Sequence, residues 1–76
     1  MEVIIGRVYK HYKGDYYIVE NVAKHTETGE MLVIYRALYG DGTLYARPYN
    51  MFVEKVSKAN DDYRFTLKNI ESVVKR

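Results

Sequence analysis

Two histidines and a glutamate are the side chains whose types could support proton transfer or metal binding in this sequence. His25 and Glu27 stand two positions apart in the polar segment 25–30, and His11 precedes them. An imidazole beside a carboxylate can move a proton near neutral pH, so a small hydrolase-like or acid–base enzyme using His11 or His25 with Glu27 is one hypothesis. No cysteine or third histidine completes a zinc-type ligand set. We therefore expect no metal, no cofactor and no catalytic residue, with His25 and Glu27 hydrogen-bonded to the backbone of their own loop.

Tyrosine is the most unusual feature of the composition, since nine of the 76 residues are tyrosines. A chain of this length has a small core, so some of these rings must be exposed. Tyr39 and Tyr45 lie between Arg36 and Arg47 along the sequence. Exposed aromatic rings beside guanidinium groups suit peptide side chains, nucleobases and protein interfaces. A functional surface of tyrosine and arginine is thus a hypothesis beside the simpler one, in which the rings only build the core.

Arg36 lies on an otherwise apolar strand face, which leaves two interpretations. The guanidinium could pair with a carboxylate, such as that of Glu20, Glu27 or Glu30, and be structural. It could instead hold a phosphate or carboxylate ligand through two parallel hydrogen bonds. The same alternatives apply to Arg47.

We predict a non-enzymatic module that uses a Tyr/Arg/His surface. Its candidate binding residues are Arg36, Tyr39, Tyr45, Arg47, His11, Lys13, His25 and Glu27. A protein partner or a second copy of the chain is favoured, because a net charge of 12 − 10 = +2 makes a weak field for nucleic acid. Nucleic acid stays as an alternative partner, and a purely self-assembling structural domain is a third hypothesis.

Length and composition also indicate the number of domains and the compartment in which the protein functions. The length predicts one domain over 1–76. The lack of cysteine favours the cytoplasm over an oxidising compartment. No apolar run approaches the about 20 residues that span a bilayer, so we expect no membrane contact.

The elements that must position these residues are short strands. The alternating segments 32–39 and 44–47 predict a hairpin, because Gly40 and Gly42 allow a tight turn between them. Both faces of the first arm are largely apolar, which predicts a central strand. Asn21 predicts a bulge or a bend. Further expectations are an arm or strand at 3–6, strands at 7–12, 16–23, 52–56 and 63–67, a helical turn at 49–52 and another from Asn69 onward.

These elements predict a mainly β fold, either a small, strongly bent antiparallel sheet or an SH3-like, partly open barrel, with a short C-terminal helical turn. The segment 57–76 would supply a closing strand and a tail.

The sequence also resembles a bacterial family called domain of unknown function 1653, over about residues 6–56. The resembling residues of the first half are Gly6, Tyr9, His11, Lys13, Gly14, Tyr17, Val19, Ala23, His25, Thr26, Glu27 and Glu30. Those of the second half are Val33, Tyr35, Arg36, Ala37, Leu38, Tyr39, Gly40, Leu44, Arg47, Pro48, Met51 and Phe52. Tyr45 stands where the family usually has tryptophan. The resemblance implies a compact, mostly β domain and implies no activity.

Overall fold

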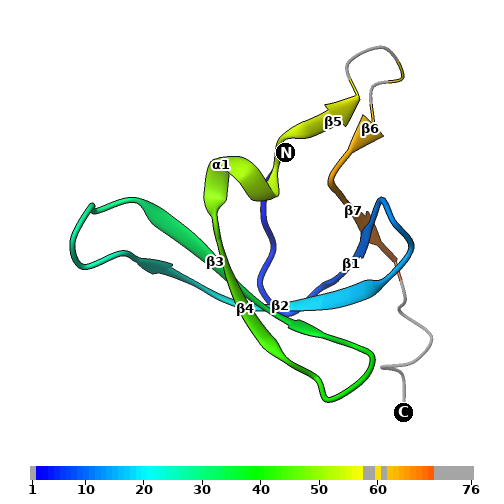
Figure 1. Cartoon of the computed structure of the whole chain (residues 1–76), viewed down its shortest axis with the longest axis horizontal. Helices are drawn as coiled ribbons and strands as arrows, with labels where there is room; N and C mark the ends of the chain where they lie inside the picture. Colours follow the sequence, from blue (N-terminus) through cyan, green and yellow to red (C-terminus); the bar gives the residue numbers. More distant parts are fainter. Residues whose placement is uncertain (1, 58–59, 61, 70–76) are drawn as a thin grey trace.

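One strongly bent antiparallel sheet organises the chain (Figure 1). The computed structural model describes residues 2–57, 60 and 62–69. Its main sheet has the order β4-β3-β2-β1-β7 and does not close into a barrel, while β5 and β6 pair separately. The bent antiparallel sheet predicted above is therefore confirmed. The elements are β1 (Val8–His11), β2 (Tyr16–Lys24), β3 (Met31–Ala37), β4 (Leu44–Pro48), α1 (Tyr49–Phe52), β5 (Lys55–Ser57), β6 (Asp62–Tyr63) and β7 (Phe65–Lys68).

The hairpin of β3 and β4 forms where the glycines allow it. Gly40 and Gly42 take φ values of 57° and 68°, in the left-handed region that glycine enters without strain. The Ala37 N–H donates to the Thr43 carbonyl oxygen at 2.9 Å, which fixes the register of the hairpin. β3 then lies between β4 and β2, as its two apolar faces predicted.

A bulge in β2 accompanies the bend of the sheet. The pairing of β2 with β3 shifts between Val19 and Asn21, where Glu20 is the extra residue. Such an insertion bends its strand and increases the local twist. Val19 pairs with Tyr35 before the bulge, and Val22 with Val33 after it, so inward-facing side chains stay on the concave side.

Aromatic rings fill the concave side of the sheet. Phe52 of α1 stacks on Phe65 of β7, with ring centroids 4.0 Å apart and planes 5° apart. Tyr9, Tyr17 and Tyr35 pack around this pair, and Val19, Val33 and Ala37 complete the buried cluster. The helical turn predicted at 49–52 is confirmed as α1, and it carries a ring that plugs the core.

Two segments differ from the predicted elements, and a third, residues 3–6, takes one of its two predicted forms. The strand expected at 52–56 starts only at Lys55, because α1 ends with the Val53 N–H bonded to the Tyr49 carbonyl oxygen. The strand expected at 63–67 divides into β6 and β7, and β7 extends the sheet beside β1. Residues 3–6 form an arm, with Val3 packed against the core, and make no strand. The C-terminal helical turn predicted after Asn69 lies outside the described residues.

Candidate functional site

Arg47 lies on the concave face of the sheet, where two aromatic residues hold its side chain. Its Nε donates a hydrogen bond to the Tyr35 hydroxyl at 3.0 Å. Its guanidinium carbon lies 5.7 Å from the ring centroid of Phe65, in a cation–π arrangement. The side chain is half-buried, and within residues 2–57, 60 and 62–69 no carboxylate pairs with it. A cation is thus fixed in place, and among the described residues one of its five N–H donors, that of Nε, makes a hydrogen bond.

Three tyrosines form a packed wall beside Arg47. The Tyr45 ring stacks on Tyr35 at 5.6 Å, and the Tyr17 ring meets Tyr39 and Tyr45 edge-on at 5.6 and 6.3 Å. The hydroxyls of Tyr17 and Tyr39 are 2.8 Å apart. Centroid separations of this size mean that the rings already touch, so no cation fits between them as in an aromatic cage. A ligand must therefore lie on the outer surfaces of Tyr39 and Tyr45, which are 43% and 41% exposed.

The hydroxyls of Tyr17 and Tyr45 stay protonated at neutral pH. Burial, followed by the hydrogen bond with Tyr39, raises the pKa of Tyr17 well above its ordinary value. The electrostatic effect of Tyr39, followed by burial, raises the pKa of Tyr45. Tyr17 and Tyr45 consequently offer neutral O–H groups and place no negative charge beside Arg47.

His11 borders the wall on the side of β1. Its ring meets Phe65 edge-on at 5.0 Å, and its Nδ1 accepts a hydrogen bond from the Lys13 N–H at 3.2 Å. Burial lowers the pKa of His11 first, and the positive charges of Arg47, Arg64 and Lys13 lower it further, while Asp15 opposes them. The imidazole is therefore neutral at pH 7. Several cations around one ring also show that this part of the surface is locally positive.

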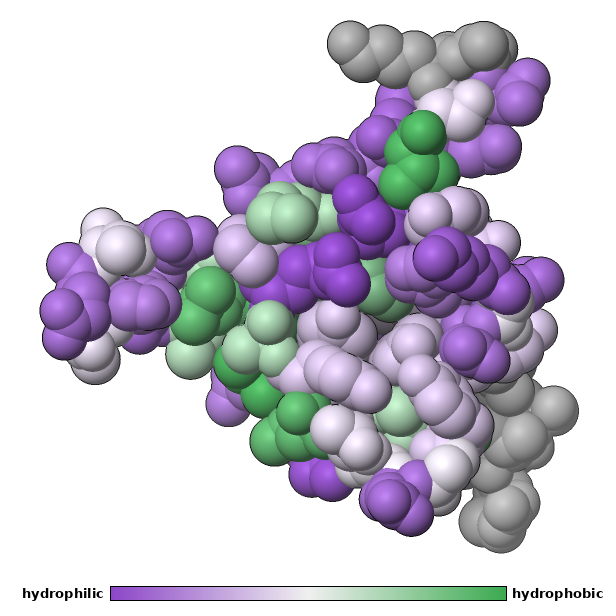
Figure 2. Space-filling model, viewed as in Figure 1, coloured by the Kyte–Doolittle hydropathy of each residue, from purple (hydrophilic) through white to green (hydrophobic). Residues whose placement is uncertain are grey.

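We call the set Tyr17, Tyr39, Tyr45, His11 and Arg47 the aromatic–arginine face. Figure 2 shows pale, weakly hydrophilic side chains gathered over the region where β2, β3 and β4 meet, next to strongly hydrophilic ones near the centre of the view. Four of the eight predicted binding residues, Tyr39, Tyr45, Arg47 and His11, come together here. Lys13 lies alongside, with its ammonium 5.9 Å from the Tyr12 ring centroid.

Arg36, His25 and Glu27 lie elsewhere. Arg36 occupies the opposite face of the sheet, where its Nε donates to Glu20 at 2.8 Å and its Nη1 to the Gly42 carbonyl oxygen at 2.9 Å. The hydrogen bond and charge of Glu20 raise the pKa of Arg36, as expected for a structural pair.

His25 and Glu27 lie at the tip of the β2–β3 hairpin, away from the end of β1 that carries His11 (Figure 1). His25 Nδ1 accepts hydrogen bonds from the Glu27 and Thr28 N–H groups at 3.0 and 3.3 Å, so it organises its own loop. Glu27 is exposed beside it. The described part of the chain holds no cluster of three histidine or acidic side chains placed to bind a metal, and none of its helices is long and apolar enough to cross a membrane.

The comparisons with known proteins agree with this fold. A family model described as "Protein of unknown function (DUF1653)" matches residues 7–67. This chain belongs to the DUF1653 family. A crystal structure of a DUF1653 protein from Bordetella bronchiseptica has 33% sequence identity and a TM-score of 0.72, over 83% of this chain and 85% of that one. Among curated proteins, none matches significantly. The family match includes β5, β6 and β7, beyond the range 6–56 that the motifs indicated.

Tyr17 of the aromatic–arginine face was absent from the predicted binding residues, and so were two residues beside the face. Phe65 supports Arg47 from below, and Arg64 adds positive charge near His11 while its Nη2 binds Glu54 at 2.6 Å. The alternation of Tyr63, Arg64 and Phe65 predicted a strand. Nothing in the sequence indicated that this strand would pair with β1 and reach Arg47.

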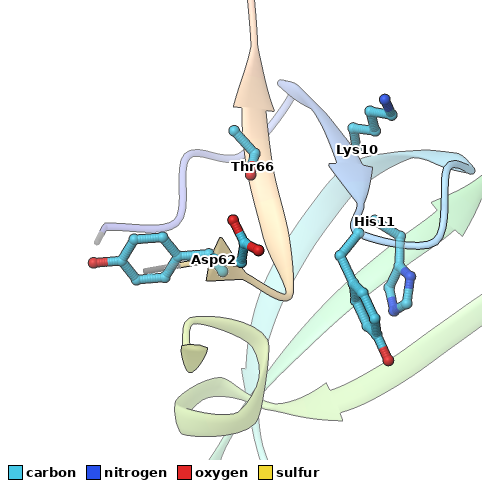
Figure 3. Close-up of a pocket in the computed structure, with 6 residues that line it drawn as sticks. Lys10, His11, Asp62 and Thr66 are labelled. Carbon is cyan, nitrogen blue, oxygen red and sulfur yellow. The ribbon is translucent and has the colours of Figure 1, made fainter. Parts of the chain in front are cut away.

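A depression of about 280 Å³ lies on the other side of His11, between β1, β6 and β7 (Figure 3). Its lining includes Asp62 and Thr66 as well as Lys10 and His11. Lys10 and His11 project in opposite directions from β1, as neighbours on a strand do (Figure 3). The side chains of Lys10 and His11 therefore do not converge on one point in this depression. A second depression, lined by Glu30, Met31, Tyr49 and Asn50, contains none of the aromatic–arginine face.

Proposed function

We propose that this DUF1653 domain is a non-enzymatic, SH3-like binding module that recognises a protein partner through the aromatic–arginine face. The recognised group is a carboxylate next to a flat or apolar side chain. The observation that carries the proposal is Arg47, a half-buried guanidinium without a carboxylate partner among the described residues, held between Tyr35 and Phe65.

The geometry around Arg47 supports a carboxylate ligand. A guanidinium presents a planar fork that matches two carboxylate oxygens, and one hydrogen bond already fixes its orientation. Fixing the side chain beforehand reduces the conformational entropy that binding would otherwise cost. Tyr39 and Tyr45 then offer rings with polar hydroxyls, which are common anchors of protein interfaces.

A protein partner is favoured over a nucleic acid on charge. The chain has a net charge of +2, and Arg36 and Arg64 are both paired with glutamates. Proteins that follow a nucleic-acid strand use a continuous basic groove. Steep loss of binding with added salt would favour the nucleic acid instead.

The separation of His11 from Glu27 argues against an enzyme that pairs these two residues, and in the other pair the Nδ1 of His25 is occupied by the backbone of its own loop. His11 belongs to the aromatic–arginine face, whereas His25 and Glu27 lie at the far hairpin tip. An acid–base pair must stand within hydrogen-bond reach of one substrate atom. The absence of cysteine also supports our inference that the module acts in the cytoplasm.

Titration of the ¹⁵N-labelled domain with phenylacetate, followed by NMR, tests the proposal. Phenylacetate carries a ring and a carboxylate, and phenylacetamide is the matched neutral control. We expect shifts at Tyr45, Arg47 and His11 with phenylacetate and at most weak ones with phenylacetamide. A hydrogen bond to a charged group contributes about 1.5–3 kcal/mol, so Arg47→Gln should weaken binding about ten- to hundredfold.

Arg36→Gln is the control variant, because Arg36 lies on the opposite face and pairs with Glu20. It should bind phenylacetate as the wild type does. Shifts that are absent from the aromatic–arginine face, or equal affinities of the Arg47→Gln and Arg36→Gln variants, would refute the proposal.

A further inference from the structure

The outer edge of β4 carries backbone groups that pair with no other strand of the described residues. The hydrogen bond from the Ala37 N–H to the Thr43 carbonyl oxygen identifies 37 and 43 as a hydrogen-bonded pair of the antiparallel ladder. Such pairs alternate along a ladder, so Tyr45 and Arg47 face β3 through their backbone groups. The N–H and C=O groups of Leu44 and Ala46 therefore point away from the sheet. Within the described part of the chain, no strand follows β4 on that side.

Residues 44–46 of this edge lack the features that usually protect an edge strand, while Arg47 and Pro48 follow them. Natural edges carry lysines, prolines or bulges that prevent pairing with another chain. Leu44 is 47% exposed, and Tyr45 and Ala46 are also exposed, with no charge among the three. Pro48, like Leu44 and Ala46, turns its backbone away from β3, so its lack of an N–H removes no hydrogen bond to β3. The same lack means that the row of outward N–H groups ends at Ala46. The edge is thus short, apolar and open.

The charge beside this edge selects among partners. Arg47 lies on the concave side of β4 with no carboxylate partner in the described residues. The charges of Arg47, Lys13 and Arg64 also act on the ring of His11, although Arg64 is paired with Glu54. A strand that pairs with β4 would place its side chains directly opposite Tyr45 and Arg47 on this side. An acidic side chain opposite Arg47 would complement the charge.

We propose that the partner is an extended acidic peptide segment that adds to β4 as an antiparallel strand, with a carboxylate opposite Arg47 and an aromatic or apolar side chain opposite Tyr45. This inference rests on the proposed function and names its partner. Main-chain hydrogen bonds to Leu44 and Ala46 give affinity, and the two side-chain positions give specificity.

Strand pairing dictates the spacing in the partner. Side chains on one face of a strand recur every second residue, so the recognised pattern is acid, any residue, aromatic. The middle residue opposes Ala46 on the convex side. Moving the acid by one position sends it to the wrong face. A peptide that only rests on the aromatic–arginine face without pairing would tolerate that move.

The test compares three peptides on the ¹⁵N-labelled full chain by NMR titration. They are acetyl-STEVYTS-amide, the neutral acetyl-STQVYTS-amide and the displaced acetyl-STVEYTS-amide. We expect the first to bind about tenfold more tightly than either control, as for one charge-assisted contact. Bound peptide should also slow hydrogen exchange at the amides of Leu44 and Ala46.

Ala46→Pro separates strand addition from simple contact with the face. This change removes an outward N–H and leaves every hydrogen bond to β3 intact, and Ala46→Thr is the matched variant that keeps the N–H. We expect Ala46→Pro to lose peptide binding at least tenfold and still bind phenylacetate, while Ala46→Thr binds both. Should Ala46→Pro fail to fold, Leu44→Pro removes the other outward N–H and gives the same comparison.

The outcomes discriminate between the two proposals. Equal peptide binding by the Ala46→Pro and Ala46→Thr variants, or equal affinity for the three peptides, overturns strand addition and leaves the binding face standing. Failure of both phenylacetate and peptide to bind overturns the face itself. Protection of Leu44 and Ala46 that grows with protein concentration, without peptide, would show that a second copy occupies the edge and would also overturn the inference.

Discussion

The hydrogen bond between Arg47 and Tyr35 should be measurable as a coupling energy in folding. Tyr35→Phe removes only the hydroxyl, and the buried ring keeps its contacts with Tyr17, Phe52 and Phe65. Its partner in the structure is the Arg47 Nε, 3.0 Å away on a half-buried side chain. Neutral hydrogen bonds contribute about 0.5–1.5 kcal/mol net and those to charged groups about 1.5–3 kcal/mol. For a partly exposed cation we expect a coupling of about 1–2 kcal/mol.

A double-mutant cycle isolates this coupling. The free energy of unfolding is measured by urea denaturation for the wild type, Tyr35→Phe, Arg47→Met and the double variant. A loss of 1 kcal/mol lowers Tm by about 4–8 °C in a domain of this size, so thermal unfolding gives an independent check. The control cycle combines Tyr35→Phe with Arg36→Met, because Arg36 is adjacent in sequence but lies on the opposite face.

The control cycle should give no coupling within error. A coupling below about 0.3 kcal/mol between Tyr35 and Arg47 would show that the hydroxyl does not hold the guanidinium. The rigid presentation of Arg47, on which the proposed function depends, would then be wrong.

Three further predictions concern the surroundings of the site. The folded pKa of His11 is below its ordinary value of 6.5, so the unfolded chain binds more protons than the folded chain in this pH range. The contribution of His11 to the free energy of unfolding is therefore complete above pH 6.5 and decreases below it. Urea denaturation of His11→Gln at several pH values should lack that part of the decrease. Phe65→Ala should lower the free energy of unfolding by about 3–5 kcal/mol, a large part of the about 4–11 kcal/mol expected for a chain of this length. Circular dichroism should then show a chain that is mostly unfolded after mild heating. A loss under about 1 kcal/mol would contradict the core position of Phe65. Gly42→Ala should cost about 1–2 kcal/mol because φ is +68° there, and Gly42→Asn should cost less; equal denaturation midpoints for these two variants would argue against backbone strain.

Local patterns predicted the parts of the fold that depend on neighbouring residues. The glycines at 40 and 42 identified the β3–β4 turn, the two apolar faces identified β3 as central, and Asn21 marked the bulge. Each of these features is decided by backbone conformation or by alternation over a few positions. The strand expected at 52–56 was displaced because α1 uses Phe52 to plug the core, which is a tertiary effect.

Local patterns could not predict that Arg36 would pair with a glutamate while Arg47 would be held by aromatic rings. Arg36 and Arg47 both stand in alternating strands next to tyrosines. Arg36 meets Glu20 because the β2–β3 register, with its bulge, places them on the same convex surface. Arg47 meets Phe65 because β7 pairs with β1 and faces β4 across the core, a contact between residues distant in sequence. Local patterns therefore identified both arginines as candidate binding residues, and the pairing of the strands determined that Arg47 is the one held at the site.

Core and site share side chains in this domain, which shapes how its function can be tested. Tyr35 and Phe65 are buried core rings and are also the two groups that hold Arg47. A substitution in either ring will lower stability and disturb the cation together, so loss of binding alone would not reveal a binding role. Groups that face outward avoid this problem, because changing them removes no core contact. The outward N–H of Ala46 is such a group, so the Ala46 variants separate recognition from folding. Replacing Arg47 also removes its contacts with Tyr35 and Phe65, so the binding of an Arg47 variant has to be compared together with its free energy of unfolding.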